Sequence, residues 1–387
     1  MLIDTTLREG AQMFGTSFDT ATRRTILSLL VRVGVEEVEA GWVGRQDLQE
    51  FVRWARAEAG STALGLWSRL DEADVAAAAA LGLAGSDVRL NVGVPVSDAH
   101  IEQRLGLSRG QLLTRLARVL GAARRAGLAY VSVGLEDVSR ADEAFALDAA
   151  RLAEAHGAAR IRLADSVGLL TPLRTAALVA RFKAAVGLPL AVHCHDDFGM
   201  ATANAVSALE AGADFADGSI LGIGERAGIA ASEEVLAWLA LGPRGRNYRV
   251  ELLRDLCRFV SAAAGTPVAR HKAVAGRDIF ACESGLHVHG LLREPSLLEP
   301  FAPETLGERR ILAAGEKTGR AAVRGLAARL GVVLSGSALP TLTGAVREMS
   351  RLLGRPLAED ELAGLARRAA RQHGLGRRIT GCADSGR

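Results

Sequence analysis

The sequence predicts an α/β protein, a closed (β/α)8 TIM barrel followed by a mostly helical C-terminal extension. Short β-rich apolar runs alternate with segments of helical periodicity from the first residue to about residue 240. Eight such runs occur, and eight βα units of this total length match the size of a closed barrel. Beyond about residue 245 the alternation stops. A doubly wound open sheet of eight strands is the main structural alternative.

The strands are expected at eight apolar runs, which cover residues 2–7, 35–42, 63–69, 88–94, 130–135, 159–164, 189–195 and 215–224. The segments between them have the spacing of amphipathic helices. In the first of these segments, 19–34, Asp19 or Thr20 can cap the helix and Gly34 can close it.

The chain divides into three expected regions. Residues 1–245 form the barrel, 246–319 form a linker and a lid-like subdomain rich in Gly, His and charge, and 320–387 form a C-terminal helical region with a loose tail.

Composition indicates a globular protein of 387 residues without a nucleic-acid or membrane partner. Hydrophobic residues make up 49% of the chain, which is enough for a large core, and Lys plus Arg exceed Asp plus Glu by a net charge of only +3. No apolar run approaches the roughly 20 residues of a membrane span, and the N-terminus lacks the apolar core of a signal peptide. The four cysteines (Cys194, Cys257, Cys282, Cys382) form no C-x-x-C pair. These features favour a reducing, cytoplasmic location.

The stretch "AVHCHDDFGM" places two histidines at the end of the seventh run. Side chains alternate along a strand, so His193 and His195 point the same way and Cys194 points the opposite way. The C-terminal ends of barrel strands form the mouth where barrel enzymes keep their chemistry. Two ordinary buried histidines remain an equally good interpretation unless another strand end supplies a carboxylate.

The first run supplies that carboxylate. "DTTLREG" ends in Arg8, Glu9 and Gly10, which alone could be a surface ion pair at a strand exit. Combined with the two imidazoles, Glu9 completes a possible site for a divalent cation. Such a site could hold a 2-oxo acid, with the metal and Arg8 stabilising negative charge that develops on its keto oxygen.

Other strand exits are polar as well. They contribute Arg69 after the third run, Glu136, Asp137 and Arg140 after the fifth, Asp165 and Ser166 after the sixth, and Glu225 and Arg226 after the eighth. A capped helix start would also explain the fifth exit, and a tight turn with Glu225 paired to Arg226 would explain the eighth.

The ordered motifs "DTTLREG", "GLEDVSR", "LADSVGLLTP", "HCHDDFGMATANAVSALEAGA", "GIGERAG" and "ESGLHVHGLL" resemble the alkylmalate synthases among the metal-dependent aldolase-like barrels. That group includes homocitrate, isopropylmalate and citramalate synthases, with acyl-CoA lyases as relatives. The resemblance runs from residue 3 to about residue 325. The wording of 193–212, and the absence of a long C-terminal regulatory domain, look most like the homocitrate synthases associated with nitrogenase cofactor assembly.

The resemblance implies a role for each motif residue. Glu9, His193 and His195 would hold a divalent metal (Mg, Mn or Zn), with Arg8 over the keto oxygen of the acceptor. The implied oxo-acid pocket would be lined by Gln12, Arg69 and Ser166, and Glu136 would lie near the reacting methyl group.

The post-barrel motif "ESGLH" carries Glu283 and His287. In this family such residues usually lie over the barrel of the neighbouring subunit, which implies a homodimer. A Gly/His-rich surface loop without a role would look the same.

Several positions depart from the family pattern. Met13 and Phe14 follow the Arg-acid-Gly turn and would lie beside the site, and Leu298 stands where a tyrosine is often found. The segment 315–319 reads "GEKTG", and Ile229 replaces the usual asparagine. Because the metal trio is kept, these changes favour an altered substrate over lost chemistry.

The expected reaction is a Claisen-type condensation of acetyl-CoA with a 2-oxo acid, 2-oxoglutarate giving homocitrate. The base would be the Glu283/His287 pair or, second, Glu136. Oxaloacetate, pyruvate, 2-oxoisovalerate or a phosphonate analogue are alternative acceptors. A 3-hydroxyacyl-CoA lyase, a barrel hydrolase and a non-catalytic binding protein remain as alternatives of other classes.

Overall fold

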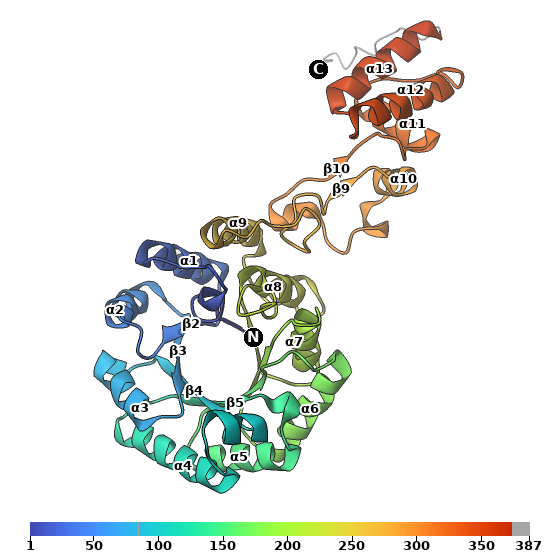
Figure 1. The fold of residues 1–387 in the computed structure, drawn as a ribbon. Coiled ribbons are helices and arrows are strands. Elements are labelled where there is room, and N and C mark those ends of the chain that lie inside the picture. Colours follow the sequence, from blue (N-terminus) through green and yellow to red (C-terminus); the bar gives the residue numbers. More distant parts are fainter. Residues whose placement is uncertain (84, 374–387) are drawn as a thin grey trace, which may run out of the picture. The chain divides into compact units, whose positions relative to one another are not determined.

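The computed structural model describes residues 1–83 and 85–373, and the chain divides into two compact units, Met1–Gly276 and a second unit that begins at Arg277 (Figure 1). The first unit extends beyond the expected barrel boundary at residue 245, and the second takes in most of the expected lid-like region together with the C-terminal helices. Cys382 and the expected tail lie outside the described residues.

The first unit is a closed barrel of eight parallel strands in sequential order, as the sequence predicts (Figure 1). The strands are β1 (Leu2–Asp4), β2 (Glu37–Trp42), β3 (Ala63–Arg69), β4 (Arg89–Pro95), β5 (Val131–Glu136), β6 (Arg160–Asp165), β7 (Leu190–Cys194) and β8 (Phe215–Gly218). Pairing of β1 with both β2 and β8 closes the barrel and excludes the open doubly wound sheet.

Helices surround this barrel, one after each strand (Figure 1). They are α1 (Thr20–Val33), α2 (Leu48–Glu58), α3 (Glu72–Ala78), α4 (Arg109–Arg125), α5 (Glu143–Ala155), α6 (Pro172–Ala185), α7 (Ala201–Glu210) and α8 (Ser232–Leu241), and α9 (Leu253–Ala264) follows. The expected ends of α1 are confirmed. The Asp19 carboxylate accepts from the Thr22 amide at 2.7 Å, and Gly34 ends the helix with φ of 93°.

Among the strands that are shorter than expected, β1 and β8 end earliest, and both differences shape the barrel mouth. The chain turns after β1 because the Thr5 carbonyl accepts from the amides of Arg8 (3.0 Å) and Glu9 (2.8 Å). Strand β8 stops at Gly218, and Ser219 to Gly222 form a turn. Glu9 is therefore carried by a turn above the strand ends, where its side chain can reach the mouth.

The interior of the barrel is charged below the mouth. The Glu37 carboxylate accepts from Arg160 at 2.7 and 2.9 Å, and both residues are at most 1% exposed. Higher up, Glu39 accepts from Arg8 at 2.6 Å and from Arg162 at 2.9 Å. Buried charges are tolerated only when paired, so these interactions fix the side chains of neighbouring strands relative to one another.

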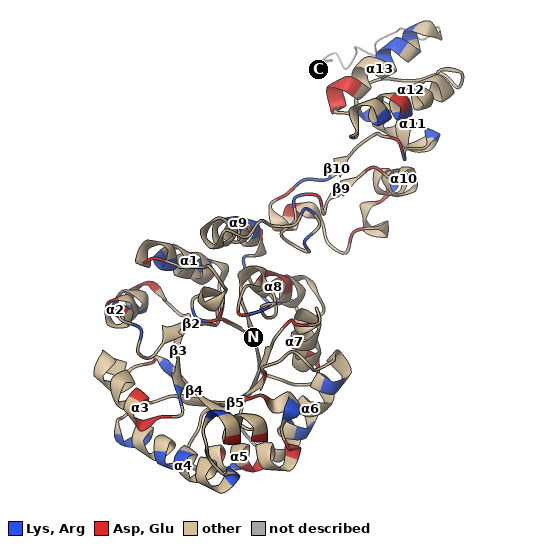
Figure 2. Ribbon diagram, viewed as in Figure 1, with Lys and Arg blue, Asp and Glu red and all other residues tan. Residues whose placement is uncertain are grey.

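The surface of the first unit carries charges of both signs. Figure 2 shows several basic positions on α4 and acidic positions on α5. In the described part of the chain, no helix is both long and apolar enough to cross a membrane.

The second unit is small and mostly helical. Its elements are β9 (Ala281–Cys282), α10 (Gly285–Arg293), β10 (Ile311–Leu312), α11 (Arg320–Arg329), α12 (Ala338–Leu353) and α13 (Glu359–Gln372). The two short strands pair in parallel, and the last three helices share a core that includes Val323, Leu342 and Leu362. This matches the expected C-terminal helical extension.

Candidate active site

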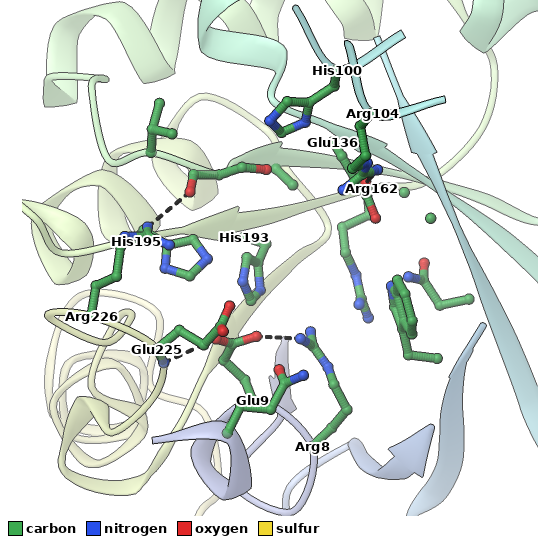
Figure 3. A pocket seen from close by; sticks show the side chains of 18 residues that line it. Arg8, Glu9, His100, Arg104, Glu136, Arg162, His193, His195, Glu225 and Arg226 are labelled. Atoms are coloured by element: carbon green, nitrogen blue, oxygen red, sulfur yellow. Dashed lines mark hydrogen bonds and ion pairs between the residues drawn. The ribbon is translucent and has the colours of Figure 1, made fainter. Parts of the chain in front are cut away.

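A cavity of about 360 Å³ opens at the C-terminal ends of the barrel strands (Figure 3). It is lined by side chains or backbone of Arg8, Glu9, Gln12, Trp67, Asn91, Gly93, His100, Arg104, Gly134, Glu136, Arg162, Ala164, Ser166, Val167, His193, His195, Glu225 and Arg226. Most of the residues singled out from the sequence are among them. The cavity is therefore the candidate active site.

Glu9, His193 and His195 converge in this cavity (Figure 3). Each offers one potential ligand atom, and these atoms all lie within 4.8 Å of one another. All three residues are buried, and the two imidazole rings lie edge to face with centroids 5.1 Å apart. This is the arrangement that the sequence predicts for a divalent cation.

The two imidazoles are prepared to donate lone pairs. His193 Nδ1 lies 2.9 Å from Asp217 Oδ2, so that nitrogen donates to the carboxylate and Nε2 is left for another partner. Burial, with the neighbouring His193, lowers the pKa of His195 to about 3, which keeps this ring neutral. The buried His195 Nδ1 has no hydrogen-bond partner.

The charge balance also fits a cation. Burial by itself would raise the pKa of Glu9, but the neighbouring groups together lower it, and the Arg8 guanidinium acts most strongly among them. Burial also opposes ionisation of Glu39, yet Arg162 and Arg8 lower its pKa to about 2. With Asp217 included, three carboxylates surround two guanidinium groups, which leaves an excess of carboxylates beside the two imidazoles. A divalent metal suits this donor set and charge.

Glu136 occupies the opposite wall of the cavity at the end of β5. Its carboxylate pairs with Arg104 at 2.5 Å. A Cβ on Gly93 of β4 would lie 2.2 Å from Glu136 Oε1 and 2.9 Å from the Trp67 ring, so only glycine permits this approach. Glu136 lines the cavity and does not cap a helix. The helix cap of α5 is Asp142.

The Ser166 hydroxyl lies at the cavity wall at the end of β6. It accepts from the Asp137 amide at 2.9 Å, which leaves its own proton available to a ligand. Arg226 does not pair with Glu225. Its guanidinium donates to Asp197 (3.0 and 2.9 Å) and to the Ser166 carbonyl (2.8 Å), while the Glu225 amide donates to Glu9 Oε1 at 3.3 Å.

Other predicted pocket residues lie outside the cavity lining. Arg69 donates three hydrogen bonds to Asp74 (2.6 to 3.0 Å), and its side chain is 71% exposed. Met13 and Phe14, which were expected beside the site, are not among the residues that line the cavity. The Met13 sulfur accepts from the Thr266 hydroxyl at 3.8 Å, and Phe14 is 99% exposed.

Glu283 and His287 belong to the second unit. Glu283 accepts from the Lys317 amide at 3.3 Å, next to the "GEKTG" turn, and His287 lies in the first turns of α10. Leu298 is in the same unit, 45% exposed.

Sequence reasoning missed several cavity and supporting residues, among them Asn91, His100, Arg104, Arg162, Asp217 and Glu39. A signal existed in β2 and β6. "EVE" and "RIR" place charged residues at a spacing of two inside otherwise apolar runs, which directs them to one face of the strand. Arg104 and His100 come from a short helical segment, Ala99–Arg104, that carried no such signal.

Comparison with known proteins agrees with this geometry. The HMGL-like family model matches residues 1–260, and the model described as homocitrate synthase post-HMGL domain-like matches residues 274–352. The chain belongs to the HMGL-like family. A homocitrate synthase of Frankia alni is 42% identical over 327 residues, covering 83% of this chain and 91% of that protein.

A further relative and a solved structure also match this chain. A 2-phosphonomethylmalate synthase of Streptomyces rubellomurinus is 33% identical over 373 residues, covering 96% of this chain and 98% of that protein. The crystal structure of an HMG-CoA lyase from Brucella melitensis has a TM-score of 0.60 at 21% identity, covering 68% of this chain and 98% of that one. The resemblance to the alkylmalate synthases is thereby confirmed, and the lyase match supports the barrel fold.

Proposed function

We propose that this protein condenses acetyl-CoA with a 2-oxo acid, and that 2-oxoglutarate is the acceptor and homocitrate and CoA are the products. The observation that carries the proposal is the convergence of Glu9, His193 and His195 beside Arg8 at the barrel mouth. The synthase relatives that align along most of the chain support the reaction type.

Glu9, His193 and His195 would hold the metal, which is Mg²⁺, Mn²⁺ or Zn²⁺. When bound, it supplies a Lewis acid for the keto oxygen of the acceptor. Arg8 directs its guanidinium to the same place, held by Glu9 and Glu39. It would stabilise the negative charge that develops on the keto oxygen during attack.

Ser166 and Gln12 would bind the acceptor from the cavity wall. The Ser166 hydroxyl has a proton to donate to a carboxylate oxygen, and the Gln12 amide lines the cavity beside Glu9. Arg69 takes no part in this proposal because Asp74 already engages it outside the cavity.

A base removes a proton from the acetyl methyl group of acetyl-CoA. The enolate carbon then forms a bond to the keto carbon of the acceptor, whose C=O electron pair moves to oxygen and takes up a proton. Water cleaves the resulting thioester to a carboxylate and the CoA thiol. We assign the base to the Glu283/His287 pair first and to Glu136, which lines the cavity, second.

The quaternary and cellular parts of the proposal follow from these assignments. Glu283 and His287 would serve the barrel of a neighbouring subunit, so the working enzyme would be a homodimer. Its partners would be small molecules, a 2-oxo acid and acetyl-CoA, and we expect it in the cytoplasm without a nucleic-acid or membrane partner.

The test is thiol release from acetyl-CoA with Mg²⁺ or Mn²⁺, across 2-oxoglutarate, oxaloacetate, pyruvate, 2-oxoisovalerate and 3-phosphonopyruvate. We expect chelator-sensitive release that is fastest with 2-oxoglutarate. Faster release with another acid would keep the reaction and replace the acceptor. Silence with every acid, or cleavage of a 3-hydroxyacyl-CoA without net hydrolysis, would contradict the proposal.

A further inference from the structure

Arg162 of β6 is a buried cation in the cavity whose hydrogen bonds are incomplete. Its side chain is 3% exposed, and Nη1 donates to Glu39 at 2.9 Å. Nε lies 3.2 Å from Asp217 Oδ2, but neither Nε nor Nη2 has a hydrogen-bond partner. A buried donor without a partner costs free energy, so such a group in a binding cavity indicates a missing ligand.

Arg160, two residues earlier on the same face of β6, shows what a purely structural arginine looks like here. Its Nη1 and Nη2 both donate to Glu37, at 2.7 and 2.9 Å, and Nε donates to Ser132 at 3.3 Å. Arg160 does not line the cavity, whereas Arg162 does. Arg162 therefore differs from Arg160 in two ways: it lines the cavity, and it has nitrogens without hydrogen-bond partners.

The strands around Arg162 leave space above and beside it. In the sheet register Gly93 of β4 pairs with Gly134 of β5, and Gly134 pairs with Arg162. Ala164, two residues nearer the mouth, pairs with the ligand residue His193. Arg162 therefore lies one side-chain layer deeper than His193, and the two glycines and the alanine leave the cavity open to it.

The other arginines that line the cavity are already engaged. Arg8 donates to Glu39 and pairs with Glu9, while Arg104 pairs with Glu136 at 2.5 Å. Arg226 donates to Asp197 and to a backbone carbonyl. Among the described residues lining the cavity, Arg162 is the arginine whose buried nitrogens lack partners.

We infer that Arg162 binds the terminal anionic group of the acceptor and selects a 2-oxo acid with a second charged end over one with an apolar side chain. This inference rests on the proposed function. An acceptor held at the metal trio and Arg8 by its keto end would extend its side chain one layer down, where Nη2 of Arg162 offers a charge-assisted hydrogen bond. A terminal carboxylate and a terminal phosphonate share this chemistry.

The experiment compares kcat/KM for four acceptors by thiol release from acetyl-CoA, using the full chain with Mg²⁺. The acceptors are 2-oxoglutarate, its 5-methyl ester, 3-phosphonopyruvate and 2-oxoisovalerate. We expect a charged acceptor to exceed the ester by about 100-fold or more, because the ester keeps the shape and removes the charge. A phosphonate preference over carboxylate would identify the source of the anion and still support Arg162.

Variants assign the selection to this residue. In Arg162→Gln the preference for charged acceptor over ester should fall to within about tenfold, and Arg162→Lys should retain part of it. Arg160→Gln is the matched control, because it removes a neighbouring buried arginine and should leave the ratio unchanged. The ratio for wild type and for Arg162→Lys remains measurable if Arg162→Gln fails to fold.

Two results would overturn the inference in different ways. Thiol release that favours the ester or 2-oxoisovalerate in the wild type would keep the condensation reaction, replace the proposed acceptor and remove the role of Arg162. A full preference for charged acceptors in Arg162→Gln would leave the proposed function standing and remove the role of Arg162. Release with none of the four would remove the proposed function and this inference with it.

Discussion

The orientation of His193 depends on a single residue of β8. Asp217 is 1% exposed, accepts from His193 Nδ1 at 2.9 Å and lies 3.2 Å from Arg162 Nε. Asp217 therefore connects His193, a candidate metal ligand, to the charged residues inside the barrel. Carboxylates that hold the second nitrogen of a ligand imidazole fix its tautomer and direction.

We expect Asp217→Asn to lower affinity for Mn²⁺ by about 10- to 100-fold, because the amide cannot hold the imidazole as the carboxylate does. Isothermal titration with Mn²⁺ measures this. Asp214→Asn is a matched control on the loop before the same strand, where Asp214 pairs with Lys183 at 2.9 Å. Equal affinities in wild type and Asp217→Asn would refute the orienting role.

The Glu233 carboxyl group is fully buried on α8 and lies 3.5 Å from the Lys272 amine. Burial, against the pull of Lys272, raises its pKa from 4.5 to about 7. The folded state then binds more protons than the unfolded state between these two values, so this group makes stability fall as pH rises from about 4.5 to about 7.

Glu233→Gln should remove that dependence. The difference in free energy of unfolding, variant minus wild type, should be about 3 kcal/mol more positive at pH 8 than at pH 4.5, because only the wild type loses stability over this range. Urea denaturation at both pH values measures it, with the exposed Glu251→Gln as control. A difference between variant and wild type that does not change with pH would contradict the burial argument.

The cavity between the strands exists because two paired positions of neighbouring strands are glycines, Gly93 of β4 and Gly134 of β5. Gly93 of β4 faces Glu136 of β5 and Trp67 of β3, and a Cβ there would collide with both. The glycine is thus required by the close approach of three strands, and it leaves Glu136 free to line the cavity.

Gly93→Ala should displace the Glu136 carboxylate, lower kcat/KM for thiol release, and destabilise the fold by about 1–3 kcal/mol through overpacking. Gly110→Ala on α4 is the control, since a Cβ there meets nothing within 4 Å. Activity and thermal unfolding of both variants decide the matter. Unchanged activity in Gly93→Ala would mean that the close packing has no consequence for the site.

Strand order and most helix positions could be predicted because alternation and caps are local signals, as in α1 with Asp19 and Gly34. The ends of β1 and β8 could not, since turns closed by the Thr5 carbonyl after β1 and by the Ser219 carbonyl after β8 leave no periodic trace. In the site, the metal trio could be predicted from strand-end positions. The roles of Arg162 and Asp217 could not be predicted, because they depend on which side chains of β6 and β8 meet inside the closed barrel.

At the scale of the whole molecule, the chain divides its candidate chemistry between two units. The metal trio and Arg8 belong to Met1–Gly276, whereas Glu283 and His287 belong to the unit that begins at Arg277. If the second unit serves a neighbouring barrel, each site needs two chains.

That arrangement predicts complementation between two inactive variants. A mixture of Glu9→Ala and Glu283→Ala chains, unfolded and refolded together, should recover about a quarter of wild-type thiol release, because random pairing makes half the dimers mixed and each has one intact site. A mixture of Glu9→Ala with His195→Ala is the control and should stay inactive. No recovery in the first mixture would contradict a site shared between subunits.

We expect condensation to depend on a metal held by Glu9, His193 and His195. The most direct measurement is bound metal and thiol release on the same preparations of wild type, Glu9→Ala and the control Glu102→Ala, with and without chelator. We expect wild type and Glu102→Ala to keep the metal and to lose thiol release only with chelator. Glu9→Ala should lose metal and turnover together. Normal turnover by metal-free Glu9→Ala would show that condensation does not depend on a metal held by Glu9.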